Sequence, residues 1–396
     1  MQNNLVRKNE VRKKMKVIVV IPSDVLHFPP VISLVNIFNN LGVQTTLITT
    51  KTGFDDSNLE FVKLKEIDID YESVSNPIKK LLMIPSLSEK IWRTIDEYYN
   101  NETVIWSVSN LSLKYLGNKI KNYRYVLHFL ELSEELRYHE KLPFMKLDAH
   151  TLAEKAKAVV VPEYNRAHIT QAWWDLSSTP LIFSNKPYTN HEMDFSSNIS
   201  DSRAAKILEE IGDRKIILYQ GIISSERPLD KIIKAVGALG NQYAFVVMSG
   251  GKDIYADLGV ENYYFIPFVK PPYHLEITSR AYIGVLSYFP TRSTGYSVLN
   301  SLYCAPNKIY EFGLFGIPMI GNNIPGLKYL FDTQECGVCV ESFCEKDICD
   351  AIRKIDDNYD KYSSGSKRFY SLTDSEEEVK AIISVIKNNW DTDIVL

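Results

Sequence analysis

Short apolar runs alternate along the chain with segments whose apolar residues recur at helical spacing. A helix is predicted over residues 31–40, directly after the first apolar run. Strand-sized runs that alternate with helical patterns are typical of a parallel sheet covered by helices. In the first half of the chain these runs are KVIVVI, VQTTLIT, TVIWSV, YRYVLHFL, KAVVVP and PLIFSN.

A second series of the same kind follows, with helices predicted over residues 228–239 and 307–315. Its strand-like runs are KIILYQG, YAFVVMSGG, NYYFIPF, AYIGVLSYF, IPMIG and GVCVE. The polar stretch 185–204 between the two series has the Asn, Ser and Pro content of a linker. The pattern therefore predicts two doubly wound α/β domains, residues 15–195 and 205–375, with the boundary near residue 195. Ligands of such sheets bind at the carboxyl ends of the strands, so a site is expected in a cleft between the domains.

The two ends of the chain differ from the rest. An apolar stripe along residues 376–390 predicts a C-terminal helix that packs back on the first domain. Residues 1–14 are basic and are interpreted as a disordered extension. Attraction of this tail to an anionic membrane is the alternative.

Composition narrows the classes of function. The 396 residues carry 45 Lys and Arg against 49 Asp and Glu, a net charge of −4, which gives no basic field for nucleic acid. Neither a membrane-spanning run nor a secretory signal is recognised, so a cytoplasmic protein is expected. All five cysteines lie in the last quarter and are interpreted as reduced thiols. Zinc at Cys336 and Cys339 is the less favoured alternative, because no histidine lies nearby.

Several common catalytic motifs are missing from the sequence. The first predicted strand is followed by IPSDVLHFPP, without the glycines that bring a backbone close to a dinucleotide. The chain also lacks a P-loop, a Gly-x-Ser-x-Gly elbow and a His-Glu-x-x-His pair. Nicotinamide enzymes, P-loop ATPases, serine hydrolases of that type and zinc proteases are therefore disfavoured.

Residues 305–321, APNKIYEFGLFGIPMIG, place Glu311 among apolar residues of a predicted helix. An ionised carboxylate in such surroundings must accept hydrogen bonds. Its two oxygens suit adjacent hydroxyls, such as those of a ribose. The alternative is a structural role, in which Glu311 pairs with nearby backbone, Arg or Lys.

The string PNK-x-x-E-x4-G-x-P in this segment resembles the nucleotide-sugar motif of glycosyltransferase family 4. The resemblance covers about residues 215–342, and the first domain matches more loosely. It implies the GT-B fold, two facing Rossmann-like domains with a cleft between them. It also implies a retaining, metal-independent transfer from a nucleotide-sugar, most simply a UDP-sugar, to a glycan or lipid-linked saccharide in surface polysaccharide or glycoconjugate synthesis. No cofactor is expected.

The residues expected to contact the phosphates of the donor are basic. Arg227 directly precedes Pro228 at a predicted helix start, where free N–H groups attract anions. The family usually has a second basic residue after the strand glycine, where this chain has Ile222. Lys308 is the candidate for the second cation, and an exposed lysine without function is the alternative.

The resemblance assigns further donor contacts to residues around these. Where the family often has another glutamate this chain has Tyr303, so contacts to the donor sugar do not transfer by position. Gly295 and Tyr296 are additional candidates in the loop before it. The remaining predicted donor-binding residues are Gly221, Gly250, Val269, Asn300 and Asn307.

In the first domain, His128 at the end of YVLHFL matches a family histidine near the transferred sugar and is predicted to face the cleft. His27 and Glu163 are the acceptor-side candidates. Structural roles are the alternative for all three. The mixed Lys and apolar segment 77–92 is interpreted as a helix packed on the first sheet, with peripheral contact to an anionic membrane as the alternative.

Two other functions stay open. A catalytically silent partner of another glycosyltransferase would explain Ile222 and Tyr303. A sugar-nucleotide 2-epimerase shares the fold that the resemblance implies.

Overall fold

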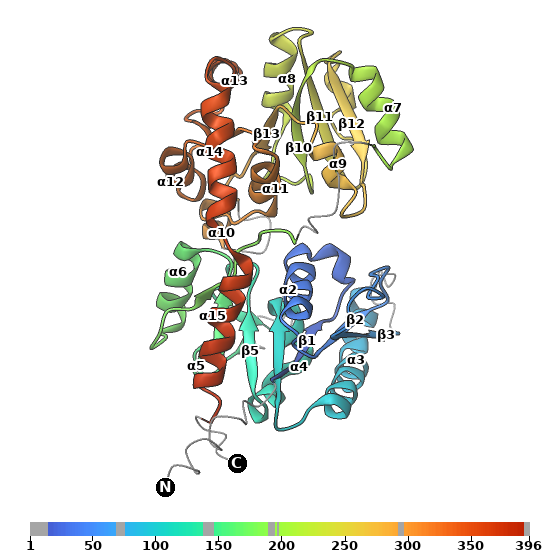
Figure 1. The fold of residues 1–396 in the computed structure, drawn as a ribbon, viewed down its shortest axis with the longest axis vertical. Helices are drawn as coiled ribbons and strands as arrows, with labels where there is room; N and C mark the ends of the chain where they lie inside the picture. Colours follow the sequence, from blue (N-terminus) through green and yellow to red (C-terminus); the bar gives the residue numbers. More distant parts are fainter. Residues whose placement is uncertain are drawn as a thin grey trace, which may run out of the picture. The chain divides into compact units, whose positions relative to one another are not determined.

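The computed structural model describes residues 15–68, 76–137, 146–188, 195, 198–291 and 297–391. The chain forms two compact units (Figure 1). Unit 1 comprises Met1–Ser184 and Ser375–Leu396, and unit 2 comprises Asn185–Asp374. The chain thus enters unit 2 after Ser184, earlier than the boundary near residue 195 that the sequence predicted.

Unit 1 is built on a parallel sheet whose described strands follow the order β3-β2-β1-β4-β5-β8-β9. The sequence pattern missed β3, because VKLKEI alternates apolar with charged residues at the edge of the sheet. The bounds are β1 Lys16–Ile21, β2 Thr45–Thr50, β3 Val62–Ile67, β4 Thr103–Val108, β5 Tyr125–His128, β8 Ala158–Val161 and β9 Leu181–Ile182; a separate antiparallel pair joins β6 Leu136–Arg137 to β7 Lys146–Leu147.

Helices pack on the sheet of unit 1. The C-terminal helix α15, Ser375–Asn388, contacts α2 and β8, and its apolar stripe is buried there. In α3, Leu87, Ile91 and Trp92 are buried in the core, as the packing interpretation of this segment predicts. The remaining helices are α2 Pro29–Asn40, α3 Pro77–Tyr98, α4 Ser109–Leu116, α5 Ala149–Glu154 and α6 Tyr164–Trp174, with short 3-10 helices η1 Val25–His27 and η2 Gly117–Asn122.

Unit 2 has a second parallel sheet, with the order β12-β11-β10-β13-β14-β15 among the described strands. From β10 the chain adds β11 and β12 on one side and then crosses to β13 on the other side. The strand order therefore reverses between β10 and β13. The bounds are β10 Lys215–Gln220, β11 Tyr243–Ser249, β12 Tyr263–Pro267, β13 Ile283–Leu286, β14 Met319–Asn322 and β15 Gly337–Val340.

Apolar cores cover both faces of this second sheet. Along β10, Ile216 and Leu218 belong to one core, whereas Ile217 and Tyr219 belong to the other, as the two-residue period of a strand requires. The predicted helix 307–315 is confirmed as α11, Asn307–Phe315. The other helices are α7 Ser202–Ile211, α8 Asp230–Ala238, η3 Ala256–Leu258, α9 His274–Thr278, α10 Val298–Leu302, α12 Pro325–Gln334, α13 Glu345–Asp357 and α14 Tyr359–Leu372.

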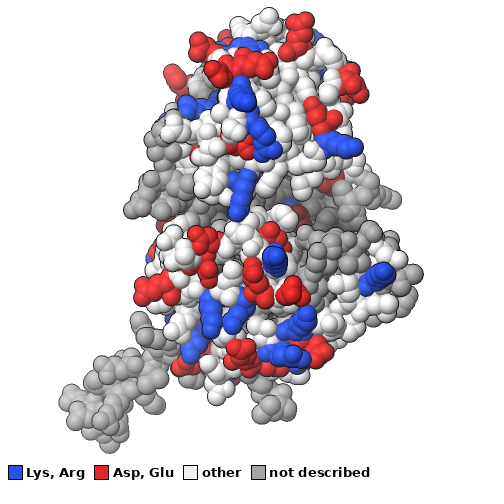
Figure 2. Space-filling model, turned by 90° about the vertical axis from the view of Figure 1, so that its right-hand side faces the viewer, with Lys and Arg blue, Asp and Glu red and all other residues white. Residues whose placement is uncertain are grey.

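The surface drawn in Figure 2 carries mixed charge. Lys and Arg side chains lie among Asp and Glu side chains on this face, without one continuous basic area. Across the described part of the chain, no helix combines the length and the apolar character that crossing a membrane requires. The predicted basic extension 1–14 lies outside the described residues.

Candidate functional site

Several of the predicted donor residues lie at one place in unit 2. Gln220 ends β10, Gly221 follows it, and Tyr288 comes shortly after the end of β13. These are the two strands between which the strand order reverses. The crevice at such a reversal is where open α/β sheets bind their ligands. The helix α11, which carries Lys308 and Glu311, places both side chains beside these strand ends.

Glu311 is buried, with 6% of its surface exposed, and both of its carboxylate oxygens accept hydrogen bonds. The amide Nε2 of Gln220 donates to Oε2. The Nε2 of His274 lies 3.2 Å from Oε1 and must donate, because a carboxylate only accepts. Burial opposes ionisation, but the hydrogen bonds from His274 and Gln220 hold the pKa of Glu311 below its ordinary value. Glu311 is therefore a buried carboxylate kept in its charged form.

Lys308 lies next to this carboxylate and is also buried, with 7% of its surface exposed. Its Nζ has no hydrogen-bond partner among the described residues and lies 4.0 Å from the centroid of the Tyr219 ring. Burial, and then the nearby charge of Arg227, lower the pKa of Lys308 far below its ordinary value. The interpretation of Lys308 as an exposed lysine is therefore wrong.

Arg227 precedes helix α8, and its guanidinium lies 5.2 Å from the centroid of the Tyr288 ring. The ammonium group of Lys308 lies 5.4 Å from the same centroid. Two basic groups thus lie beside one aromatic ring at the strand ends, and the charge of Arg227 disfavours the charged form of Lys308. An anion placed between them would relieve this repulsion.

Gly221 forms the wall of the site beside Lys308. Its φ of +121° is one that residues with a side chain rarely adopt. A Cβ at this position would stand 3.4 Å from Lys308 Nζ. Gly221 is exposed, and the ammonium group of Lys308 lies next to it. The next residue, Ile222, is 71% exposed.

The other predicted donor residues lie nearby in the fold but take different surroundings. Gly250 directly follows β11, and Val269, which is buried, lies two residues after β12. They therefore lie at the same edge of the sheet as Gly221. Asn300 belongs to α10, and Asn307 is the first residue of α11. Gly295 and Tyr296 lie outside the described residues.

Comparison with known proteins supports the two-unit architecture. No family model matches the chain, and no curated protein matches it. Solved structures do. Anabaena HepE in complex with UDP-glucose superposes with a TM-score of 0.66 at 14% identity, over 94% of this chain and all of that one (100%). Sucrose-phosphate synthase from Thermosynechococcus elongatus gives 0.63 at 14% identity, over 94% and 97% of the two chains.

A protein assigned as a UDP-N-acetylglucosamine 2-epimerase from Listeria monocytogenes gives a TM-score of 0.60 at 14% identity, over 96% of this chain and 98% of that one. All three alignments run through both parallel sheets. The chain has the GT-B fold.

In unit 1 of this GT-B chain, the side chain of His128 does not lie where the sequence predicted. The residue ends β5, but its ring has no exposed surface and packs between Trp106 and Phe183. The indole N–H of Trp106 donates to Nδ1 at 3.2 Å, and burial lowers the pKa of His128 to about 3. The prediction that His128 faces a ligand is therefore wrong, because the strand end directs the ring into the apolar interior of the unit.

The acceptor-side candidates of the GT-B chain differ from one another. Glu163 caps helix α6, with its carboxylate accepting from the backbone N–H of Arg166 and the side-chain amide of Asn165. Both bonds are local and explain the glutamate without a ligand. His27 is exposed on the short helix η1. Nothing in its surroundings assigns it a role.

The cysteines of the GT-B chain are thiols. Burial raises the pKa of Cys336 and of Cys339 to about 12, so both thiols stay protonated. Within the part of the chain that the structure describes, no three His, Cys, Asp or Glu residues are grouped to hold a metal ion.

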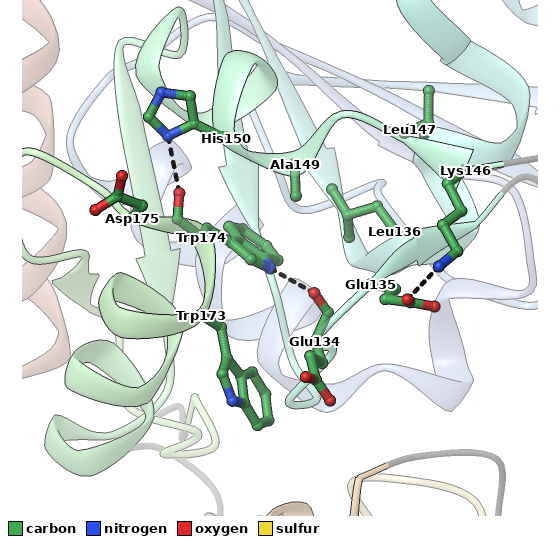
Figure 3. A pocket seen from close by; sticks show the side chains of 10 residues that line it. All are labelled: Glu134, Glu135, Leu136, Lys146, Leu147, Ala149, His150, Trp173, Trp174 and Asp175. Atoms are coloured by element: carbon green, nitrogen blue, oxygen red, sulfur yellow. Dashed lines mark hydrogen bonds and ion pairs between the residues drawn. The ribbon is translucent and has the colours of Figure 1, made fainter.

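A pocket of about 380 Å³ lies in unit 1, between the β6–β7 pair and helices α5 and α6 (Figure 3). Its polar groups are largely paired with one another. Lys146 pairs with Glu135, Nδ1 of His150 lies 2.9 Å from the carbonyl of Trp174, and the Trp174 indole donates to the carbonyl of Glu134 at 3.0 Å. None of the predicted site residues lines it.

Sequence reasoning missed Gln220, His274 and Thr278, which surround Glu311. The available signal is weak. Gln220 is a polar residue at the end of an otherwise apolar strand and directly before a glycine, which is the position of a ligand-facing residue in such sheets. His274 and Thr278 lie on the short helix α9, and only the folded chain brings them to Glu311.

Proposed function

We propose that this protein is a retaining glycosyltransferase that transfers a sugar from a nucleotide-sugar, most simply a UDP-sugar, to a glycan or lipid-linked saccharide. One observation carries the proposal. At the point where the strand order of unit 2 reverses, a charged buried carboxylate, Glu311, lies beside two basic groups, Lys308 and Arg227. Burial and the nearby charge of Arg227 lower the pKa of Lys308, so the two basic groups repel each other. A nucleoside diphosphate supplies the complement of both, hydroxyls for the carboxylate and phosphates for the cations.

These positions support the following course of reaction. In the transfer, the bond between the anomeric carbon and the phosphate oxygen breaks, and a bond to the acceptor oxygen forms on the same face. The acceptor proton passes to the departing diphosphate, whose developing charge Arg227 and Lys308 stabilise. Such stabilisation of leaving-group charge is commonly the largest catalytic contribution. The two cations fill the role that a divalent metal plays elsewhere, and we propose a metal-independent reaction.

The family resemblance and the fold support the proposal from two further sides. The PNK-x-x-E-x4-G-x-P string contains both Lys308 and Glu311. HepE, which shares the fold, is described in complex with UDP-glucose. Synthesis of surface polysaccharide or glycoconjugates rests on the resemblance alone.

Two measurements test the function. Isothermal titration with UDP, GDP and dTDP identifies the nucleotide, and a panel of sugar nucleotides with saccharide acceptors then reports transfer. Glu311→Ala and Arg227→Ala are each expected to abolish transfer while the far-UV circular dichroism stays that of the wild type. Full activity of both variants would refute the site. The exposed Lys231→Met on helix α8 serves as the control with unchanged transfer.

A 2-epimerase is the second candidate, because the Listeria monocytogenes protein shares the fold over nearly the whole chain. It predicts that the free nucleotide-sugar changes its configuration at carbon 2 when no acceptor is present. Nuclear magnetic resonance of the donor incubated with the enzyme alone distinguishes this from transfer. A silent partner protein would bind no nucleotide in the titration, and the exposed Ile222 in place of a basic residue is the feature that favours it.

A further inference from the structure

We propose that Gln220, His274 and Thr278 are positioning residues that aim the two oxygens of Glu311 at two adjacent hydroxyls, so that the site selects ribonucleoside over 2′-deoxyribonucleoside diphosphates. The inference rests on the proposed function and names the nucleotide class that this function uses. It excludes deoxythymidine diphosphate sugars as the preferred donors.

The four side chains form a chain of hydrogen bonds that runs from Thr278 through Gln220 and Glu311 to His274. Thr278 Oγ1 lies 2.7 Å from Gln220 Oε1, Gln220 Nε2 donates to Glu311, and Glu311 accepts from His274 at 3.2 Å. The same hydroxyl also lies 3.0 Å from the backbone carbonyl of His274, which competes with Gln220 for its single proton. Thr278 has no exposed surface, and Gln220 is 4% exposed. A buried chain of hydrogen bonds of this kind favours one arrangement of its side chains.

The direction of each bond follows from the charge on Glu311. If the Gln220 amide were flipped, its oxygen would face the carboxylate and two acceptors would oppose each other. The carboxylate therefore fixes Gln220 with Nε2 toward Glu311 and Oε1 toward Thr278. The single hydroxyl proton of Thr278 then points to Gln220. Thr278 thus acts on Glu311 through Gln220.

His274 completes the arrangement from the other side. Because a carboxylate only accepts, the nitrogen of His274 that faces Glu311, Nε2, carries a proton. Nδ1, on the other side of the ring, is buried without a hydrogen-bond partner among the described residues, so Glu311 is the hydrogen-bond partner of the ring. The ring is held in place by helix α9, of which His274 is the first residue.

These hydrogen bonds determine how many acceptor directions of the Glu311 carboxylate are left for a ligand. Each carboxylate oxygen has about two favourable acceptor directions, and the protein fills one on each oxygen. One direction per oxygen is left. Two hydroxyls on neighbouring carbons, as in a ribose, fill both. A 2′-deoxyribose fills one and leaves a buried charged oxygen with an unmet bond, which is costly.

A ligand-by-residue comparison tests the inference. The dissociation constants of UDP and 2′-deoxy-UDP are measured by isothermal titration for the wild type, His274→Leu, His274→Gln and Thr278→Val. Because a hydrogen bond to a charged group contributes about 1.5–3 kcal/mol, we expect the wild type to prefer UDP by about 10- to 150-fold. We expect this preference to fall at least about fivefold in His274→Leu and Thr278→Val. His274→Gln keeps a donor within reach of Glu311 and is expected to restore most of it.

The outcomes separate the two proposals. A wild type that binds neither nucleotide refutes the proposed function, and this inference with it. A wild type that binds UDP but whose preference persists in His274→Leu or Thr278→Val, with native thermal unfolding, refutes the positioning role alone. Equal weakening of both ligands also refutes it, since a merely structural residue would act in that way. Thr278→Val is nearly isosteric, so the test survives if His274→Leu fails to fold. His168→Leu, at an exposed histidine of unit 1, is the control.

Discussion

Replacing Lys308 by methionine is expected to make the free protein more stable and its nucleotide complex weaker. The Lys308 ammonium is buried without a hydrogen-bond partner among the described residues, and Arg227 repels its charged form. Methionine keeps the unbranched stem and places a polarisable sulfur near the Tyr219 ring, a favourable contact. The two effects therefore have opposite signs at one residue.

The magnitudes follow from the surroundings of Nζ. A buried donor without a partner costs about 1–3 kcal/mol, and the contact of the amine with the Tyr219 ring offsets part of this. We expect the free energy of unfolding of Lys308→Met to rise by about 1–2 kcal/mol. A charge-assisted bond to a phosphate contributes about 1.5–3 kcal/mol, so UDP should bind about 10- to 150-fold more weakly.

Urea denaturation with and without UDP, together with isothermal titration, measures both effects on one preparation. The control is Lys231→Met, whose side chain is exposed on α8, with an expected change in unfolding free energy within about 0.5 kcal/mol. A Lys308→Met protein that is less stable than the wild type yet binds UDP equally well would show that Lys308 has a structural partner and no role toward an anion.

The remaining predictions concern proton uptake, backbone and the interior of unit 1. Burial and Arg227 lower the pKa of Lys308, and a bound diphosphate would raise it again. UDP should therefore bind with uptake of up to one proton, and more tightly as the pH falls from the ordinary pKa of a lysine toward the lowered pKa of Lys308 in the free protein. Titration in buffers of different ionisation enthalpy measures this uptake, and equal heats in all buffers would contradict it. Gly221→Val should lower the free energy of unfolding by about 1–3 kcal/mol, because valine tolerates a φ of +121° poorly. The same variant should bind UDP more weakly, and an unchanged affinity would place the ligand elsewhere. His128→Leu should leave UDP affinity and transfer unchanged while thermal unfolding shifts, whereas lost transfer with native stability would return His128 to the site.

Much of the fold is encoded locally. Strands such as TVIWSV and helix α11 are recognisable because a strand buried on both faces needs a continuous apolar run, and a helix needs its own spacing. The edge strand β3 was not predicted because one of its sides is solvated and charged residues alternate with apolar ones in its sequence, VKLKEI. The boundary between the units was also not predicted correctly. The backbone N–H and the hydroxyl of Ser184 donate to the carboxylate of Glu378, which is far away in the sequence, and this holds Ser184 in unit 1.

For the candidate site, the sequence predicted Glu311 and Arg227, because a charged residue in an apolar or helix-start context needs a partner, and it predicted Lys308 through the resemblance of its motif. Their burial and their neighbours were decided by tertiary structure. Gln220, Thr278 and His274 come from a strand end and a separate short helix, and they meet Glu311 only when β10, α9 and α11 pack together. His128 was misjudged for the same reason. A residue's place along a strand follows from local sequence, but whether its side chain meets a ligand or the core depends on what the rest of the chain packs against it.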